Sequence, residues 1–321
     1  MVKKQLHNKK FAQEFDLGRR NFLKMIGTIT ASTLFSGCAS LKSKESGNKE
    51  DYLTLEDGTK IWYHQCSGKK GYSPFVFIHG NAQNHTAAEE TLKYLNNLGH
   101  PVIAYDLPGH GNSQAYVNGK YSMERLSRNL GDILDSVECS KPILVGHSMG
   151  GMIALQYAAQ KPKSVRGLVL IDTSDVDPVK VNKAIPLDEI IKGIIKTSHE
   201  ISEKNLQGKV YPYNENPQLT EEEILGVGLK YTVPEALEGN FTATGDYDVR
   251  DKLSSLNIPA LILRGEKDVL MTAEMTQAMR ERIKNSKEFT IAGYGHNFLI
   301  QRPDLLIGKV RENYGFLTKE D

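Results

Sequence analysis

Residues 146–150 read Gly-His-Ser-Met-Gly, which is the pattern G-x-S-x-G. An apolar run at 143–145 precedes this segment and a helix-forming stretch at 152–160 follows it. This order predicts a tight strand-to-helix turn, in which the glycines avoid side-chain clashes and the Ser148 hydroxyl is raised from the edge of a sheet. The N–H of Met149 would then lie at a helix N-terminus, where free amides and the helix dipole favour an oxyanion. We therefore predict Ser148 as a nucleophile and the Met149 amide as an oxyanion donor.

Short apolar runs bounded by glycine and proline recur on both sides of this motif. Runs of this length predict strands that are buried on both faces. Helix-length segments between them, such as 122–136 and 150–160, therefore predict an α/β fold with a mostly parallel sheet and helices on both faces. The turn pair Asp57-Gly58 predicts an opening hairpin. The strands are expected at 61–63, 75–78, 102–105, 143–145, 168–171, 260–263 and 288–291.

Residues 174–247 interrupt this alternation, because they contain no buried-strand pattern. Four isoleucines between positions 190 and 195 fall on one helical face, and residues 220–223 form a capping box ahead of an apolar-periodic run. The Tyr-Pro-Tyr segment at 211–213 is expected to be a loop. The segment is too long for an ordinary crossover. We therefore expect a helical lid, residues 174–247, between two parts of one core, residues 52–173 and 248–321.

A serine hydroxyl needs a general base, and histidine is the usual one. His296 lies in a glycine-rich loop after the expected strand at 288–291, and loops at strand ends are where catalytic side chains are usually held. His79 and His110 also lie beside glycines. His147 is adjacent to the serine, and its side chain should point away from the nucleophile. We therefore favour His296 as the base.

The base in turn needs an orienting carboxylate. Asp268 and Asp172 both follow a predicted strand and both lie between Ser148 and His296, so the chain order Ser…Asp…His does not separate them. Glu266 is a third candidate. We favour Asp268, and on the residues alone the other two stay open.

A second oxyanion donor is expected from the loop after the strand at 75–78. This loop begins His79-Gly80-Asn81, and its glycine allows a close approach of the backbone. The N–H of Asn81 is our candidate.

Five segments, taken together, resemble the α/β-hydrolase superfamily. Their order and spacing match that superfamily across about residues 53–316, and the set is far more specific than any one segment. The segments are Phe-Ile-His-Gly at 77–80, Tyr-Asp-Leu-Pro-Gly-His-Gly-Asn-Ser at 105–113, Gly-His-Ser-Met-Gly-Gly at 146–151, Gly-Glu-Lys-Asp at 265–268 and Gly-Tyr-Gly-His at 293–296.

The resemblance implies an α/β-hydrolase fold with Ser148 as nucleophile, Asp268 as acid and His296 as base. It implies an oxyanion hole made by the amides of Asn81 and Met149. It also favours the aspartate of the Gly-Glu-x-Asp segment over its rivals, since the superfamily usually carries its acid there. The acyl transfer that such a site performs requires no metal or organic cofactor.

Hydrolysis of a carboxylic ester is the expected reaction, because the segment at 146–151 is similar to many carboxylesterases and monoacylglycerol lipases. A serine at this turn, in place of aspartate, argues against epoxide hydrolase and haloalkane dehalogenase chemistry. Carbon–carbon bond hydrolysis and acyl transfer to another acceptor are alternatives on the same triad. A non-catalytic ligand-binding lipoprotein is the alternative of another class. A formal net charge of +1 gives no global field for nucleic acid, so we expect a small ester or lipid-like partner.

The N-terminus predicts export. A basic segment at 18–24 is followed by an apolar run at 25–35, which is about half of the roughly 20 residues that span a bilayer. The basic segment resembles a twin-arginine signal, although it has glycine at 18 where Ser or Thr is usual. Residues 34–38 resemble a lipoprotein cleavage box ending in Cys38, although Phe35 replaces the usual Leu. The two resemblances imply a signal peptide at 1–37, lipidation of Cys38 and a membrane anchor on the extracytoplasmic side of a bacterial membrane.

Residues 38–51 are rich in Ser, Lys, Glu and Gly, a composition that cannot bury a core, so we expect a flexible tether. Export would place Cys66 and Cys139 in an oxidising compartment. They fall on different, non-adjacent predicted elements, and we therefore expect two free thiols.

Overall fold

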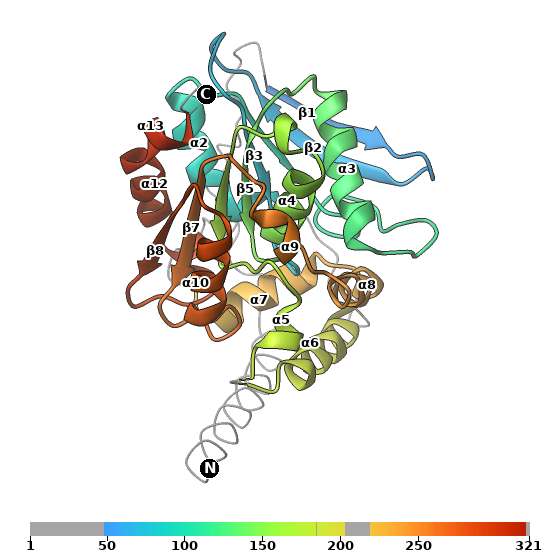
Figure 1. Ribbon diagram of the computed structural model, residues 1–321. Helices are drawn as coiled ribbons and strands as arrows, with labels where there is room; N and C mark the ends of the chain where they lie inside the picture. Colours follow the sequence, from blue (N-terminus) through green and yellow to red (C-terminus); the bar gives the residue numbers. More distant parts are fainter. Residues whose placement is uncertain (1–47, 184, 203–218, 319–321) are drawn as a thin grey trace.

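The computed structural model describes residues 48–183, 185–202 and 219–318 (Figure 1). The predicted signal peptide, Cys38 and the predicted loop at 211–213 lie outside these residues. None of the helices within the described ranges combines the length and apolar character needed to cross a membrane. Cys66 is buried, Cys139 is partly buried and both thiols are free, as predicted.

The described residues contain a single eight-stranded sheet, in the order β1-β2-β4-β3-β5-β6-β7-β8. The pairs β1–β2 and β2–β4 are antiparallel and the other five pairs are parallel, so the prediction of a mostly parallel sheet is confirmed. The strands are β1 (Asn48–Thr54), β2 (Lys60–Cys66), β3 (Phe75–Ile78), β4 (Val102–Tyr105), β5 (Ile143–His147), β6 (Gly167–Ile171), β7 (Ala260–Gly265) and β8 (Ser286–Ile291).

Helices cover both faces of the sheet because successive side chains of a strand point to opposite faces. In β3, Val76 and Ile78 belong to one apolar cluster with α3, α4 and α10, whereas Phe75 and Phe77 belong to another with α2, α11, α12 and α13. Figure 1 shows α3 on one side of the sheet and α2 and α12 on the other. These helices are α2 (Glu89–Asn97), α3 (Met123–Ser136), α4 (Met149–Gln160), α10 (Ala273–Arg282), α11 (Phe298–Gln301), α12 (Pro303–Glu312) and α13 (Tyr314–Leu317), with two short 3₁₀ helices, η1 (His85–Ala88) and η2 (Pro162–Ser164).

The predicted tether needs a correction at its end. We expected it to reach residue 51, but Asn48 already pairs with Cys66 and β1 runs from there to Thr54. The composition hid this strand because β1 is an edge strand whose residues 49–52 are all exposed. Backbone hydrogen bonds to β2, and not a buried side-chain face, hold these residues.

The described part of residues 174–247 is helical, apart from connecting loops and isolated bridges. We call this segment the insertion; Figure 1 shows its helices gathered at one end of the sheet. The predicted capping box is confirmed, since the Thr220 hydroxyl accepts from the N–H of Glu223 and the Glu223 carboxylate accepts from the N–H of Thr220. The helices are α5 (Pro178–Val181), α6 (Leu187–Ser202), α7 (Glu221–Lys230) and α8 (Pro234–Thr244), and α9 (Arg250–Leu253) follows the insertion.

Candidate active site

The strand-to-helix turn at Ser148 is strained and needs its glycines. Ser148 has φ +51° and ψ −121°, outside the regions that a non-glycine residue ordinarily adopts. A Cβ on Gly150 would lie 2.0 Å from the carbonyl oxygen of Ile78, and one on Gly146 would lie 2.5 Å from the Cα of Gly151. The turn is also fixed to β6, because the N–H of Ser148 donates to the carbonyl of Ile171 at 2.9 Å. Strain held in place by its surroundings is typical of a nucleophile turn.

The two residues predicted to supply the oxyanion-hole amides lie close to the Ser148 turn. Met149 is the first residue of α4, so its N–H has no acceptor within the helix. Gly80, just before Asn81, runs so close to the turn that an added Cβ would lie 3.1 Å from the Cβ of Ser148. Asn81, Ser148 and Met149 all line one cavity.

His296 is held by the carboxylate of Asp268. Its Nδ1 lies 2.8 Å from Asp268 Oδ2, and the other carboxylate oxygen accepts from the N–H groups of Leu270 and Met271 at 2.8 and 3.1 Å. Burial raises the pKa of Asp268, but the charge of His296 and these hydrogen bonds lower it more, so that its pKa lies below the ordinary value. Burial lowers the pKa of His296, but the charge of Asp268 and the hydrogen bond to it give a net rise. The pair is therefore built to stabilise an imidazolium.

The rival carboxylates make other contacts. Asp172 Oδ1 accepts from the N–H of Gly265 at 2.7 Å, and its Oδ2 is buried without a partner among the described residues. Burial, followed by the charge of Asp268, raises the pKa of Asp172 well above its ordinary value and so favours its protonated form. Glu266 Oε2 instead accepts from the N–H of Gly293 at 2.8 Å and so holds the loop that carries His296.

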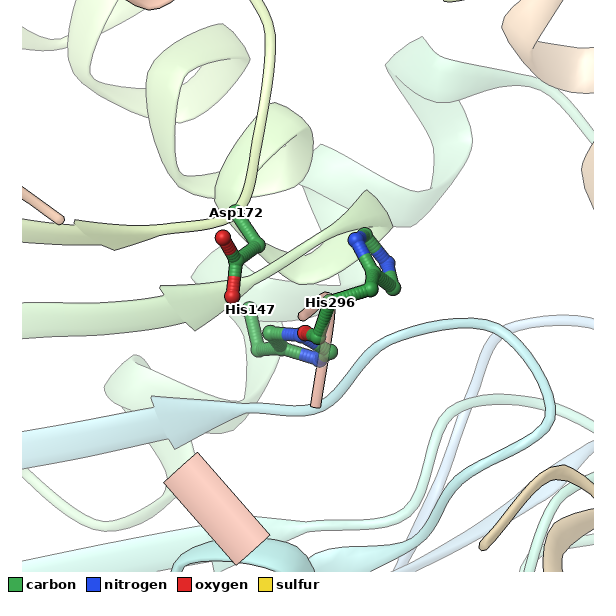
Figure 2. A group of neighbouring side chains, drawn as sticks. All are labelled: His147, Asp172 and His296. Atoms are coloured by element: carbon green, nitrogen blue, oxygen red, sulfur yellow. The ribbon is translucent and has the colours of Figure 1, made fainter. Parts of the chain in front are cut away.

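The cluster of His147, Asp172 and His296 could be mistaken for a metal site (Figure 2). One ligand atom from each of the three residues lies within 4.8 Å of the others. However, His147 Nε2 lies 2.7 Å from the carbonyl oxygen of His296 and its Nδ1 lies 2.8 Å from Gln83 Oε1. Because both ring nitrogens of His147 are already in contact with oxygen atoms of the protein, this ring offers no free ligand atom to a metal ion.

His147 shows a role that the sequence did not predict. We expected only that its side chain points away from the nucleophile, but its Nε2 lies 2.7 Å from the backbone carbonyl oxygen of His296, so the ring packs against the loop of His296. Burial and the nearby His296 lower the pKa of His147 to about 3, which keeps the ring neutral, so only one of its two nitrogens carries a proton and donates. The amide of Gln83 links His147 to Asn297, and no sequence motif marks either of these two partners.

His79 and His110 hold the loops around Asn81. The Nδ1–H of His79 donates to the carbonyl of Gly80 at 2.7 Å, and its Nε2 accepts from the N–H of Leu107 at 2.9 Å. Burial lowers the pKa of His79 to about 4 and that of His110 to about 3. Both rings are completely buried and neutral, so they support the loop and are not candidates for the base.

The site opens into an apolar cavity of about 400 Å³ between the core and the insertion. Ser148 and His296 line this cavity together with apolar side chains from α6, α7 and α8, such as Ile191, Ile224 and Leu237. A mainly apolar cavity with a few convergent polar groups is typical of a small-molecule site.

The chain was compared with protein families, with known sequences and with solved structures. The profile of the family described as alpha/beta hydrolase fold matches residues 73–303. The chain is 27% identical to Lipase 3 of Moraxella sp. over 290 residues, covering 85% of this chain and 89% of that protein. It is also 27% identical to an esterase of Mycobacterium tuberculosis over 252 residues, covering 74% and 80% of the two chains. The crystal structure of a hydrolase from Pseudomonas aeruginosa superposes with a TM-score of 0.68 at 23% identity, covering 83% and 98%.

Proposed function

The chain belongs to the α/β-hydrolase family, and we propose that it is a serine hydrolase that cleaves carboxylic esters with Ser148, His296 and Asp268. The contact that carries this proposal is the 2.8 Å hydrogen bond between His296 Nδ1 and Asp268 Oδ2. This bond uses Nδ1 and leaves Nε2 of His296 available to accept a proton. His296 also lines the same cavity as the strained Ser148. The similarity to a lipase and an esterase supports an ester as the substrate.

The reaction follows from these positions. His296 Nε2 takes the proton of the Ser148 hydroxyl as the serine oxygen attacks the ester carbonyl, and Asp268 stabilises the imidazolium that forms. The N–H groups of Asn81 and Met149 hold the oxyanion, and loss of one such donor typically costs about 100-fold or more in turnover. The imidazolium then protonates the leaving alcohol, and water attacks the acyl-enzyme with His296 again acting as base.

An ester with an apolar acyl group fits the cavity best. Isoleucine and leucine side chains of the insertion line the same cavity as Ser148, and burying an acyl chain against them contributes about 0.8 kcal/mol per methylene group. Carbon–carbon bond hydrolysis and acyl transfer to another acceptor would use the same triad and differ in the leaving group or the acceptor. The paired His296 and Asp268 speak against a protein that uses the fold only for binding.

Turnover of a series of p-nitrophenyl esters, from acetyl to palmitoyl, tests this function. The full chain in detergent is compared with Ser148→Ala, and both are treated with a fluorophosphonate probe that labels active serines. We expect turnover and labelling of Ser148 in the wild-type chain and neither in the variant. Labelling without ester turnover would favour a narrower reaction, such as carbon–carbon bond cleavage. Neither labelling nor turnover in the wild-type chain would contradict the serine hydrolase.

We also propose that the protein is exported and anchored to a bacterial membrane through a lipid on Cys38, which rests on the sequence of residues 1–38. Cell fractionation and labelling with a radioactive fatty acid test this proposal. We expect the label and the membrane association to be lost in Cys38→Ala. Export should also fail when Arg19 and Arg20 are both replaced by lysine. An unlabelled wild-type chain would refute the anchor.

A further inference from the structure

The loop that carries His296 is bound by a residue of the insertion. Glu221 is the first residue of α7, and its two carboxylate oxygens accept from the backbone N–H and the side-chain Nδ2 of Asn297, at 3.1 and 2.5 Å. Asn297 directly follows His296. An added Cβ on Gly295 would lie 2.8 Å from Glu221 Oε1, so the carboxylate is packed against the loop on both sides of the histidine.

The contact continues to the other half of the site. Asn297 Oδ1 accepts from Gln83 Nε2 at 2.8 Å, and Gln83 Oε1 accepts from the N–H of Gly80 at 2.9 Å. Gly80 directly precedes Asn81, whose amide is the proposed oxyanion donor. A chain of hydrogen bonds therefore runs from α7, through the loop of the base, to the loop of the oxyanion hole.

Helix α7 is itself fixed to the core at both ends. At its start, Gln301 Nε2 donates to the carbonyl of Leu219 at 2.9 Å. After its end, the N–H of Val233 donates to the carbonyl of Gly109, and the N–H of Gly111 donates to the carbonyl of Tyr231, each at 2.8 Å. These anchors mean that the position of Glu221 is set by the frame of the protein, so it can in turn set the position of the loop.

The charge of Glu221 acts on the base as well. His296 is faced by the carboxylate of Asp268, by Glu221, by the neutral ring of His147 and by the carboxyl group of Asp172, whose pKa is raised. The negative charge of Glu221 raises the pKa of His296, in addition to the larger effect of Asp268.

We propose that Glu221 is a positioning residue for the catalytic base: it fixes the loop of His296 through Asn297, and its charge favours the imidazolium that forms during the reaction. The proposal rests on the proposed serine hydrolase activity. Under this proposal, α7 not only lines the cavity but also positions His296 through Glu221.

The test compares Glu221→Gln with Glu222→Gln, which removes the same charge from the next residue. Glu222 is exposed and also lines the cavity, but it makes no hydrogen bond to the described loop of His296, so this variant controls for the loss of a negative charge from the cavity wall. Turnover of p-nitrophenyl butyrate is measured from pH 5 to 9. In Glu221→Gln we expect kcat to fall between about tenfold and 100-fold with little change in KM, because misplacing a catalytic group costs about this much. Its acid limb should move to lower pH, because the charge that raised the pKa of His296 is gone.

Asn297→Ala separates position from charge, since it removes the link but keeps the carboxylate. We expect kcat to fall while the acid limb moves less than in Glu221→Gln. A Glu221→Gln variant whose kcat and acid limb match those of Glu222→Gln would overturn the proposal. So would a change confined to KM, which would indicate that Glu221 only contacts substrate.

A second measurement does not depend on activity. The pKa of the His296 ring is followed by NMR, with the signal assigned by comparison with His296→Gln. It should fall in Glu221→Gln and stay in place in Glu222→Gln. If the wild-type chain neither turns over esters nor reacts with a fluorophosphonate, the proposed function fails. This titration would then still decide the effect of Glu221 on His296, and equal values in all three chains would overturn it.

Discussion

Asp268 and Asp172 offer a direct test of which carboxylate serves the base. In Asp268→Asn, the 2.8 Å contact with His296 Nδ1 loses its charge, and the new amide can present its NH₂ group to that nitrogen. The proton of the ring then moves to Nε2, where it blocks the nitrogen that must accept the serine proton. A substitution of this kind in a serine hydrolase triad lowers kcat by about 10⁴-fold, which corresponds to about 5.5 kcal/mol of transition-state stabilisation.

The matched substitution is Asp172→Asn, which should retain most of the activity. Burial and the charge of Asp268 raise the pKa of Asp172 and favour its protonated form, which a neutral asparagine resembles. An asparagine there keeps a carbonyl oxygen for the N–H of Gly265 and can donate from its amide toward Asp268. Initial rates with p-nitrophenyl butyrate at pH 8 give kcat for both variants, and circular dichroism checks that both fold.

Stability measurements give the same pair of residues a second readout. Because the folded-state pKa of Asp172 is raised, the native protein binds this proton more tightly than the unfolded chain does. The stabilisation is complete below the unfolded-state pKa and is lost as the pH rises through the folded-state pKa. Urea unfolding should therefore show that Asp172→Asn gains stability relative to the wild-type chain between pH 4 and pH 8.

A loss of kcat in Asp172→Asn as large as that in Asp268→Asn would refute this assignment of the two acids.

Three further expectations concern the pH profile, the turn and the cavity. The acid limb of kcat/KM should have its midpoint above 6.5, since Asp268 raises the pKa of His296 above that value, and a midpoint below 6 would contradict the pairing. Gly150→Ala should lower the free energy of unfolding, measured with urea, by at least about 2 kcal/mol, because the new Cβ would lie 2.0 Å from a backbone oxygen. Gly308→Ala should leave that free energy unchanged or raise it slightly, because nothing lies within 4 Å of a Cβ there. Leu237→Trp should narrow the cavity and lower turnover of palmitoyl esters more than that of acetyl esters, and an unchanged chain-length profile would exclude this wall as the acyl site.

The strands could be predicted where they are buried on both faces, because such strands have an unbroken run of apolar residues. The predicted segments 75–78 and 102–105 coincide with β3 and β4, which are buried at every residue. The segment at 288–291 fell two residues short of the start of β8. The first four residues of β1 were missed for the opposite reason. The side chains of residues 49–51 are exposed, and backbone pairing with β2 does not require any particular composition.

A site residue could be predicted from the sequence only where a reactive side chain lies in a motif that also fixes its local backbone conformation. Ser148 lies in a motif whose glycines are required by contacts within a few residues or with the adjacent β3. The choice between Asp268 and Asp172 could not be made from the residues alone, because both follow strands that lie side by side. What separates them is the direction of each side chain, which sends one carboxylate to His296 and the other to the N–H of Gly265.

The groups that support the proposed triad could not be predicted from the sequence, because their contacts join distant segments. Gln83 and Asn297 are 214 positions apart, and Glu221 and Asn297 are 76 positions apart. Each is a polar residue in a loop or at a helix start, where such residues are common. Only the fold brings them together, at the end of the sheet where the loops after β3, β5 and β8 meet the start of α7. One of these four elements belongs to the insertion. If Glu221 positions His296 as proposed, exchanging the insertion for another helical segment should lower turnover as well as change the shape of the cavity.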